Sequence, residues 1–146
     1  MITIKEVASQ ETYTVRQQVL RQGKPIESCI FDGDDAPSTF HLGLYESGLL
    51  AGIVSVFQSA SSHFSETDQY QLRGMAVLEN HQKKGMGEKL VSEAERLVTQ
   101  KQGRLIWFNA REAATGFYRK LGYKIIGDVF TIGDIGPHYV MFKKFR

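Results

Sequence analysis

The sequence has few of the features that mark secreted, membrane or nucleic-acid-binding proteins. Cys29 is the only cysteine among 146 residues, which excludes an internal disulfide and suits a reducing compartment. No run approaches the roughly 18 apolar residues of a membrane helix, and the start lacks the apolar stretch of a signal peptide. The net charge is only +2, so the overall balance gives no nucleic-acid-binding surface. We therefore expect a cytoplasmic protein without membrane or nucleic-acid partners.

Metal-binding patterns are missing as well. The four histidines do not have the spacing of metal ligands, and no cysteine pair assists them. The acidic segment 32–35 lacks the glutamate that a calcium loop carries at its twelfth position. We therefore expect no metal cofactor.

The composition, with 42% hydrophobic and 23% charged residues, is that of an ordinary globular protein. We expect residues 1–146 to form one domain with its own core. The residue patterns predict a strand over 2–8, a helix from a Ser9 cap to Gly23, a hairpin of 40–45 and 49–57, and a last strand over 138–145. Between the hairpin and the last strand, strands alternate with helices, so we expect an α+β or α/β three-layer domain.

The most informative segment is Gln82-Lys83-Lys84-Gly85-Met86-Gly87. It lies between a strand-like run, 70–77, and a segment with apolar residues at helical spacing. A glycine-rich turn that opens a helix directs backbone N–H groups and the positive end of the helix dipole to one point. The segment is therefore a candidate site for a phosphate or pyrophosphate. The alternative is a glycine-containing turn that binds nothing.

Two common nucleotide-binding motifs do not fit this segment. A P-loop would close with lysine and a hydroxyl residue, whereas Gly87 is followed by Glu88 and Lys89. A dinucleotide fingerprint needs a third glycine where this chain has Leu90.

A second motif follows about thirty residues later. Residues 104–109 read as a buried strand, and a short helix with apolar residues on one side comes next. Ala114-Thr-Gly-Phe-Tyr-Arg-Lys-Leu-Gly122 ends this helix with a glycine, the residue that commonly takes a left-handed backbone there. This segment matches the A-x-x-F-Y-x-K-L-G pattern of the GNAT superfamily, the Gcn5-related N-acetyltransferases. Gln82–Gly87 matches that family's pyrophosphate loop, Q/R-x-x-G-x-G/A. The chain therefore resembles this family over roughly residues 67 to 145.

The resemblance implies a fold and an activity. The fold is α+β, a mixed and mostly antiparallel central sheet with a splayed parallel pair of strands, flanked by helices. The activity is direct transfer of an acetyl group from acetyl-CoA to a primary amine, and we expect the amine to belong to a small molecule. A homodimer is compatible with the sequence. Two alternatives stay open: a non-catalytic acyl-CoA-binding or regulatory module of the same fold, and a nucleotide-binding domain, which would prefer ATP to CoA.

The resemblance also assigns residues to the cofactor. The loop amides would hold the pyrophosphate, the strand after Gly74 would pair with the pantetheine arm, and an amide near Met75 would stabilise the tetrahedral oxyanion. Gly74 would suit a bulge that splays the strands. The cofactor-binding residues expected on this basis are Met75, Ala76, Val77, Gln82, Lys83, Lys84, Gly85, Met86, Gly87, Glu88, Asn109, Ala114, Phe117 and Tyr118.

Tyr118 matches the family's general acid, which would protonate the departing thiolate of CoA. The alternative is that Tyr118 is only a core aromatic residue beside Phe117. The general base is less clear, because some relatives have a glutamate where this chain has Gln71. A water relay or His138 would then accept the proton. His138 follows a Gly-Pro turn, so it could equally be a surface residue.

Two arginines complete the candidate site. We expect Gln71 and Arg73 on one strand face and Arg111 near the cofactor. The hypothesis is that Arg73, Arg111 and His138 recognise an anionic acceptor, such as a carboxylate, since arginine forms bidentate pairs with carboxylates. The alternative is that the arginines are structural. We expect the acceptor pocket to involve segments 25–37, 59–68 and 133–138.

Overall fold

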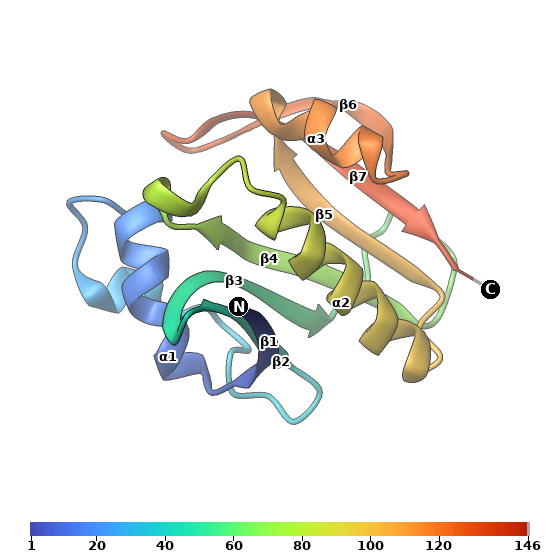
Figure 1. Cartoon of the computed structure of the whole chain (residues 1–146). Helices are drawn as coiled ribbons and strands as arrows, with labels where there is room; N and C mark the ends of the chain where they lie inside the picture. Colours follow the sequence, from blue (N-terminus) through green and yellow to red (C-terminus); the bar gives the residue numbers. More distant parts are fainter. Residues whose placement is uncertain (146) are drawn as a thin grey trace. The chain divides into compact units, whose positions relative to one another are not determined.

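The computed structural model describes residues 1–145 of the chain (Figure 1). Its strands are β1 (Ile2–Val7), β2 (Phe40–Glu46), β3 (Leu49–Gln58), β4 (Gln69–Val77), β5 (Leu105–Arg111), β6 (Lys124–Ile132) and β7 (Gly136–Lys144). Its α-helices are α1 (Ser9–Val15), α2 (Met86–Gln100) and α3 (Thr115–Lys120). The predicted hairpin is confirmed as β2 and β3, and the last strand begins at Gly136, two residues before the predicted start.

The strands follow one another in the order β1-β2-β3-β4-β5-β7-β6. β4 and β5 are parallel, with a register from the pair Gln69 and Leu105 to the pair Gln71 and Trp107. The pairs β1–β2, β2–β3, β5–β7 and β6–β7 are antiparallel. The expected α+β architecture with a mixed, mostly antiparallel sheet is confirmed.

The chain divides into two compact units. The N-terminal unit comprises Met1–Phe57 and Leu72–Leu97, and the C-terminal unit comprises Gln58–Gln71 and the chain from Val98 onward. The boundaries fall inside β3, β4 and α2, so three continuous elements belong to both units.

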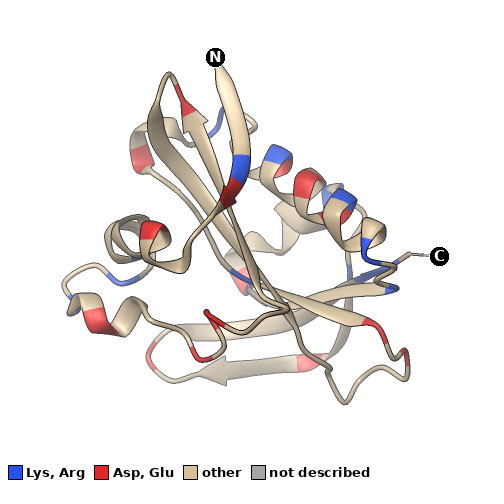
Figure 2. Ribbon diagram, turned by 90° about the horizontal axis from the view of Figure 1, so that it is seen from below, with Lys and Arg blue, Asp and Glu red and all other residues tan. Residues whose placement is uncertain are grey.

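The core of the N-terminal unit contains Val15, Ile53 and Ala76, from α1, β3 and β4. Helix α2 is amphipathic, and its predicted apolar stripe is confirmed because Met86, Leu90 and Ala94 are buried. Acidic and basic residues are interspersed along the ribbon and are not segregated by sign (Figure 2).

The core of the C-terminal unit contains Leu105, Trp107 and Val140, from β5 and β7. The Trp107 indole nitrogen donates to the Ser59 carbonyl at 2.9 Å, which fixes the start of the predicted 59–68 loop. Gly122 ends α3 with a φ of +96°, as its position in the motif predicted.

The predicted helix from Ser9 to Gly23 is only partly correct. α1 ends at Val15 and continues as a π-helix, η1 (Arg16–Leu20). The helix cap is Ala8, so the prediction that Ser9 caps the helix is wrong. The Ser9 hydroxyl instead donates to a carboxylate oxygen of Asp35 at 2.6 Å. A π-turn adds one residue to a helical turn and changes which side chains face inward.

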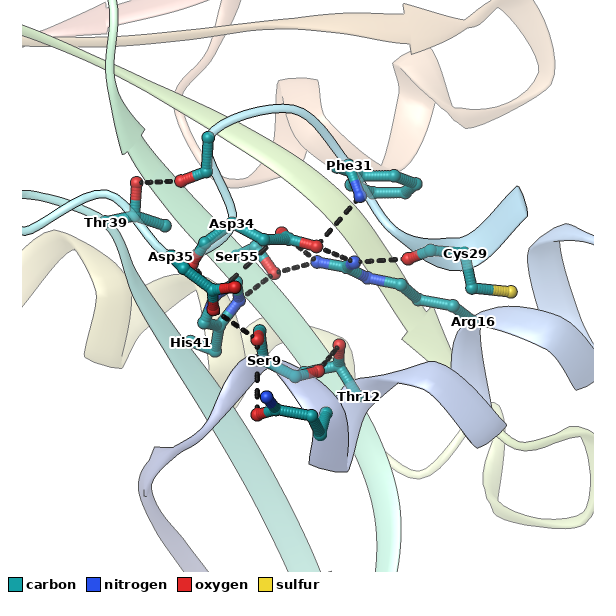
Figure 3. A network of polar contacts seen from close by, with 12 residues as sticks. Ser9, Thr12, Arg16, Cys29, Phe31, Asp34, Asp35, Thr39, His41 and Ser55 are labelled. Atoms are coloured by element: carbon teal, nitrogen blue, oxygen red, sulfur yellow. Dashed lines mark hydrogen bonds and ion pairs between the residues drawn. The ribbon is translucent and has the colours of Figure 1, made fainter. Parts of the chain in front are cut away.

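The first residue of η1, Arg16, is fully buried. Its guanidinium donates twice to the Asp34 carboxylate, at 2.7 and 2.9 Å (Figure 3). It also donates to the Cys29 carbonyl at 2.6 Å and to the Ser55 hydroxyl at 2.9 Å. The network therefore joins η1, the 26–34 segment and β3 through one buried charge pair.

The same network includes His41 of β2. One ring nitrogen, Nδ1, lies 2.7 Å from the Ser55 hydroxyl, and the other lies 2.9 Å from the Asp34 carbonyl (Figure 3). Burial opposes ionisation of Asp34, but hydrogen bonds from Arg16 and the Phe31 amide outweigh it and lower the pKa of Asp34.

Candidate active site

The segment between β4 and α2 has the backbone geometry that an anion site needs. Lys83 and Gly85 both take positive φ values, +64° and +79°, and α2 begins at Met86. No atom lies within 4 Å of the position that a Cβ on Gly85 would occupy. The Gln82 side chain donates to the Val77 carbonyl at 2.9 Å and ties the loop to the end of β4.

This geometry leaves the first N–H groups of α2 without helical partners, because the first intrahelical acceptor is the Gly85 carbonyl, which Lys89 contacts at 3.2 Å. Left-handed residues next to a helix start can form a concave backbone surface that suits an anion. Lys83, Lys84 and Glu88 are exposed beside it. The loop can therefore present backbone donors and two lysine charges to a phosphate.

Upstream of the loop, β4 contains a left-handed residue, Gly74, with a φ of +64°. A Cβ at Gly74 would lie 3.2 Å from the Phe31 ring. Such a backbone turn within a strand redirects its amides. The residues after it, Met75 and Val77, are partly exposed, whereas Ala76 is buried in the core.

A hollow of about 800 Å³ borders the loop in the N-terminal unit. It was not predicted from the sequence, since its lining comes from η1 and from the turn after β4. Most of its polar lining consists of uncharged amide side chains. They are Gln17, Gln18, Gln22, Asn80 and Gln82.

In the C-terminal unit, α3 holds Tyr118 among aromatic rings. Its ring centroid lies 4.3 Å from that of Phe108 on β5, 5.0 Å from that of Phe117 and 6.2 Å from that of Tyr123. Tyr118 is partly exposed, and Phe117 is 36% exposed. Tyr118 therefore packs as an aromatic residue while part of its surface faces solvent.

Burial raises the pKa of Tyr118 to about 12. The phenol stays protonated at physiological pH and can donate a hydrogen bond. Full proton transfer to a thiolate whose conjugate acid has a pKa of ~8.5 is unfavourable from such a phenol. The transfer becomes easier only if the same apolar surroundings also raise the pKa of the thiol.

Arg111 and His138 are brought together by strand pairing. They are register partners on β5 and β7, so their Cα atoms face each other across the two strands. Arg111 is exposed, and Asn109, two residues earlier on β5, is exposed too. The expected cofactor residue Ala114 lies at the start of α3 and is partly exposed.

His138 is only 4% exposed, so its interpretation as a surface residue is wrong. Its Nδ1 lies 2.8 Å from the Gly136 carbonyl. A carbonyl oxygen only accepts, so Nδ1 carries the proton and Nε2 of the neutral ring keeps a lone pair. This is the tautomer that a general base requires.

Arg73 lies in the other unit from Arg111 and His138. Its guanidinium carbon is 4.6 Å from the Phe31 ring centre and 5.3 Å from that of Phe57. Gln71 is partly exposed and pairs in register with Trp107. Arg73 thus lies beside Phe31 in the N-terminal unit, and Arg111 and His138 form a register pair in the C-terminal unit.

Sequence analysis missed the buried cluster around Arg16. The available signal was the spacing of Arg16, which follows Thr12 by four residues and precedes Val19 by three, so that a helix places it on the inward face. Arg16 and Thr12 are both fully buried. Among residues 1–145, no group of three or more histidine, cysteine, aspartate or glutamate side chains is arranged to hold a metal ion. Nor is any helix of that part of the chain sufficiently long and apolar to span a membrane.

Comparison with known proteins agrees with this geometry. The model of the acetyltransferase (GNAT) domain matches residues 37–125. An uncharacterized N-acetyltransferase of Bacillus subtilis, YitI, is 36% identical over 146 residues, covering all of this chain and 98% of the relative.

Solved structures share the fold. An aminoglycoside 6'-N-acetyltransferase complexed with coenzyme A has a TM-score of 0.78 at 17% identity, covering 97% of this chain and 96% of the other. The PaiA N-acetyltransferase of Thermoplasma acidophilum, in complex with coenzyme A, has a TM-score of 0.74 at 17% identity, covering 99% of both chains. With the family match over most of its length and a full-length relative, the chain belongs to the GNAT family of N-acetyltransferases.

Proposed function

We propose that this chain transfers the acetyl group of acetyl-CoA to the primary amine of a small molecule. The observation that carries the proposal is the 82–87 loop, where left-handed Lys83 and Gly85 precede the free amides of α2. Backbone donors at a helix start suit a pyrophosphate, and the open space at Gly85 permits close approach. The fold relatives that contain coenzyme A support the choice of cofactor.

The reaction would proceed in one direct transfer. The amine nitrogen attacks the thioester carbon, the C–S bond breaks, and the amine loses one proton while the sulfur gains one. An amide near Met75 would stabilise the oxyanion, and Tyr118 would donate to the sulfur. His138, with a free lone pair on Nε2, would accept the amine proton directly or through water.

The remaining cofactor contacts would come from the end of β4, from the 82–88 segment and from the C-terminal unit. They are Ala76 and Val77 on β4, Gln82, Lys84, Met86, Gly87 and Glu88 at the loop, and Asn109, Ala114 and Phe117 in the C-terminal unit. The single cysteine, Cys29, is buried, which is compatible with a cytoplasmic enzyme.

Calorimetric titration of the purified chain with coenzyme A and acetyl-CoA tests the cofactor. Release of free thiol from acetyl-CoA, measured with a panel of small amines, then tests turnover. We expect saturable binding of both and amine-dependent thiol release. Absence of binding to folded protein would contradict the proposal.

A non-catalytic acyl-CoA-binding module is the second candidate. Gln71 favours it, since glutamine cannot accept the proton that a glutamate accepts in some relatives. Saturable acetyl-CoA binding without thiol release for any amine would select this alternative.

A further inference from the structure

The donors of Arg73 are not used by the protein. Among residues 1–145, its guanidinium makes no hydrogen bond and no ion pair, and it lies over the rings of Phe31 and Phe57. The side chain is only partly exposed. A guanidinium has five N–H donors in a planar fork, and placing it against apolar rings without an acceptor is unfavourable. Arg73 is therefore positioned to bind an anion that the chain does not supply.

A second arginine lies over the same ring. The guanidinium carbon of Arg21 is 5.7 Å from the Phe31 ring centre. Its hydrogen bond, to the adjacent Leu20 carbonyl, is long at 3.4 Å. Two guanidinium groups with unused donors thus share Phe31 as a common support.

The buried network holds this support in place. Arg16 lies 3.8 Å from the Phe31 ring centre, and its charge is already neutralised by Asp34. The Asp34 carboxylate accepts from Arg16 and from the Phe31 amide, the latter at 2.9 Å, and in the described part of the chain it accepts no hydrogen bond from Arg73. Phe31 is therefore fixed from both its backbone and its ring.

The charges around Arg73 leave its positive charge incompletely compensated. Burial and the neighbouring charge of Arg16 lower the pKa of Arg73, against the opposing attraction of Asp34 and of exposed Asp32. Asp35, the third acid of the segment, accepts from Ser9. An added carboxylate would compensate the positive charge and satisfy the fork of donors at once.

Arg73 also stands close to the reacting group of the proposed reaction. It precedes Met75 on β4 by two residues, so their Cα atoms lie within about 7 Å of each other, the reach of two residues of extended chain. An acceptor held by Arg73 through one end could therefore present its amine near the amide that we assign to the oxyanion. The left-handed Gly74 between them leaves no side chain in the way.

We propose that Arg73, assisted by Arg21, binds a carboxylate of the acceptor, so that the substrate is a small amine that also carries a carboxylate. This inference rests on the proposed acetyl transfer. The hypothesis from the sequence grouped Arg73 with Arg111 and His138. The site proposed here instead consists of Arg73, Arg21 and the ring of Phe31 that supports both.

The test compares each amino acid with its carboxamide, for example glycine with glycinamide and β-alanine with β-alaninamide, in the thiol-release assay. We expect the carboxylate form of at least one pair to have a kcat/KM about 10- to 100-fold higher. Arg73→Gln should remove this preference by lowering the kcat/KM of the carboxylate form to that of the carboxamide, while acetyl-CoA still binds. Arg73→Lys, which keeps the charge without the fork, should fall in between, and Arg21→Gln should weaken the preference several-fold.

Arg104→Gln is the matched control, since Arg104 is an exposed arginine of the other unit. Equal turnover of both members of every pair, or a preference that survives Arg73→Gln, would overturn the inference. If acetyl-CoA binds but no amine reacts, a binding assay replaces the kinetic one. N-acetylglycine, but not N-acetylglycinamide, should then raise the melting temperature of the CoA complex. Equal melting temperatures with the two compounds would overturn the carboxylate site. Loss of acetyl-CoA binding, by contrast, is a failure of the proposed function itself.

Discussion

At the scale of single residues, Tyr118 shows how packing sets chemistry. The rings of Phe108, Phe117 and Tyr123 surround its phenol, and burial raises its pKa to about 12. An acid this weak is protonated at the start of each catalytic cycle at physiological pH. It can stabilise a forming thiolate by a hydrogen bond even where full proton transfer is unfavourable.

We expect Tyr118→Phe to lower kcat about 10²- to 10³-fold with little change in the affinity for acetyl-CoA. The phenylalanine keeps the aromatic packing and removes only the hydroxyl. Steady-state kinetics and calorimetry measure the two effects. An unchanged kcat would leave Tyr118 as a packing residue.

The same variant tests the pKa. In a spectrophotometric titration of the wild type, one phenol should ionise only near pH 12, because the folded-state pKa is raised above the unfolded value of 10.0. Folding therefore favours the neutral phenol, and stability should fall as the pH rises from about 10 towards 12. Tyr118→Phe should remove this step from the titration.

Gly85 is the second residue-scale test. Its φ of +79° disfavours any residue with a Cβ, although the space around it is open. We expect Gly85→Ala to destabilise the fold by about 1 kcal/mol and to weaken CoA binding at least tenfold, since the loop amides would turn away from the phosphate. Denaturant unfolding and calorimetry provide the readouts.

Gly48 provides a matched control for that strain. It has a φ of +85° and the same open surroundings, but it lies in the turn between β2 and β3. Gly48→Ala should destabilise the chain to a similar extent and leave CoA binding intact. Equal loss of CoA binding in both variants would mean that the loop has no special role.

At the scale of elements, one buried ion pair connects a π-helix, an irregular segment and a strand. Arg16 contributes the cation, Asp34 the anion and Ser55 a hydroxyl, and none of the three is adjacent to another in sequence. Removing one partner of a buried pair leaves an uncompensated charge, which is more destabilising than the pair is stabilising. These elements also carry Phe31 and Arg21, so we expect the pair to govern the geometry of the proposed carboxylate site.

Asp34→Asn should therefore lower the free energy of unfolding by about 3–5 kcal/mol near neutral pH. The pKa of Asp34 is lower in the folded than in the unfolded state, so its contribution is present above the usual value of 3.8 and is lost as the pH falls through the folded value. The difference between wild type and variant should narrow below about pH 4. Urea unfolding at several pH values measures it.

Glu93→Gln is the control for this prediction. Glu93 forms a 2.6 Å pair with Arg96 on the surface of α2. Because solvent screens that pair, its loss should change stability very little. A similar loss in both variants would indicate that the buried location of Asp34 is unimportant.

At the scale of the whole molecule, the chain passes between its two compact units three times, inside β3, inside β4 and inside α2. Neither unit can unfold without melting part of a strand and part of a helix that the other unit needs. We therefore propose that residues 1–146 behave as one domain. Arg146 lies outside the described residues.

Calorimetric unfolding should show a single transition whose van't Hoff and calorimetric enthalpies agree. Acetyl-CoA at a hundred times its Kd should add about 2.7 kcal/mol to the free energy of unfolding. The melting temperature of the single transition should rise accordingly. Two separate transitions, or a shift of only one of them, would contradict the single-domain proposal.

The sequence predicted what local patterns determine. Apolar spacing located α2, the glycines of 82–87 marked the turn that opens this helix, and Gly122 ended α3 as expected. It could not predict that the helix after Val15 becomes a π-helix, because that change depends on partners from distant segments. For the same reason Asp34 looked like one of several loop acids, and Arg21 gave no signal. Long-range hydrogen bonds, not local propensity, decide these positions.

Ser55 in the buried network determines which ring nitrogen of His41 carries the proton. The Ser55 hydroxyl accepts from Arg16, so its own hydrogen is free to point at Nδ1 of His41, while the Asp34 carbonyl can only accept from Nε2. The imidazole is thereby held as the Nε2–H tautomer, opposite to that of His138. Nitrogen NMR should resolve the two rings as different tautomers within one chain. Ser55→Ala should remove the constraint on the tautomer of His41 and leave that of His138 unaltered.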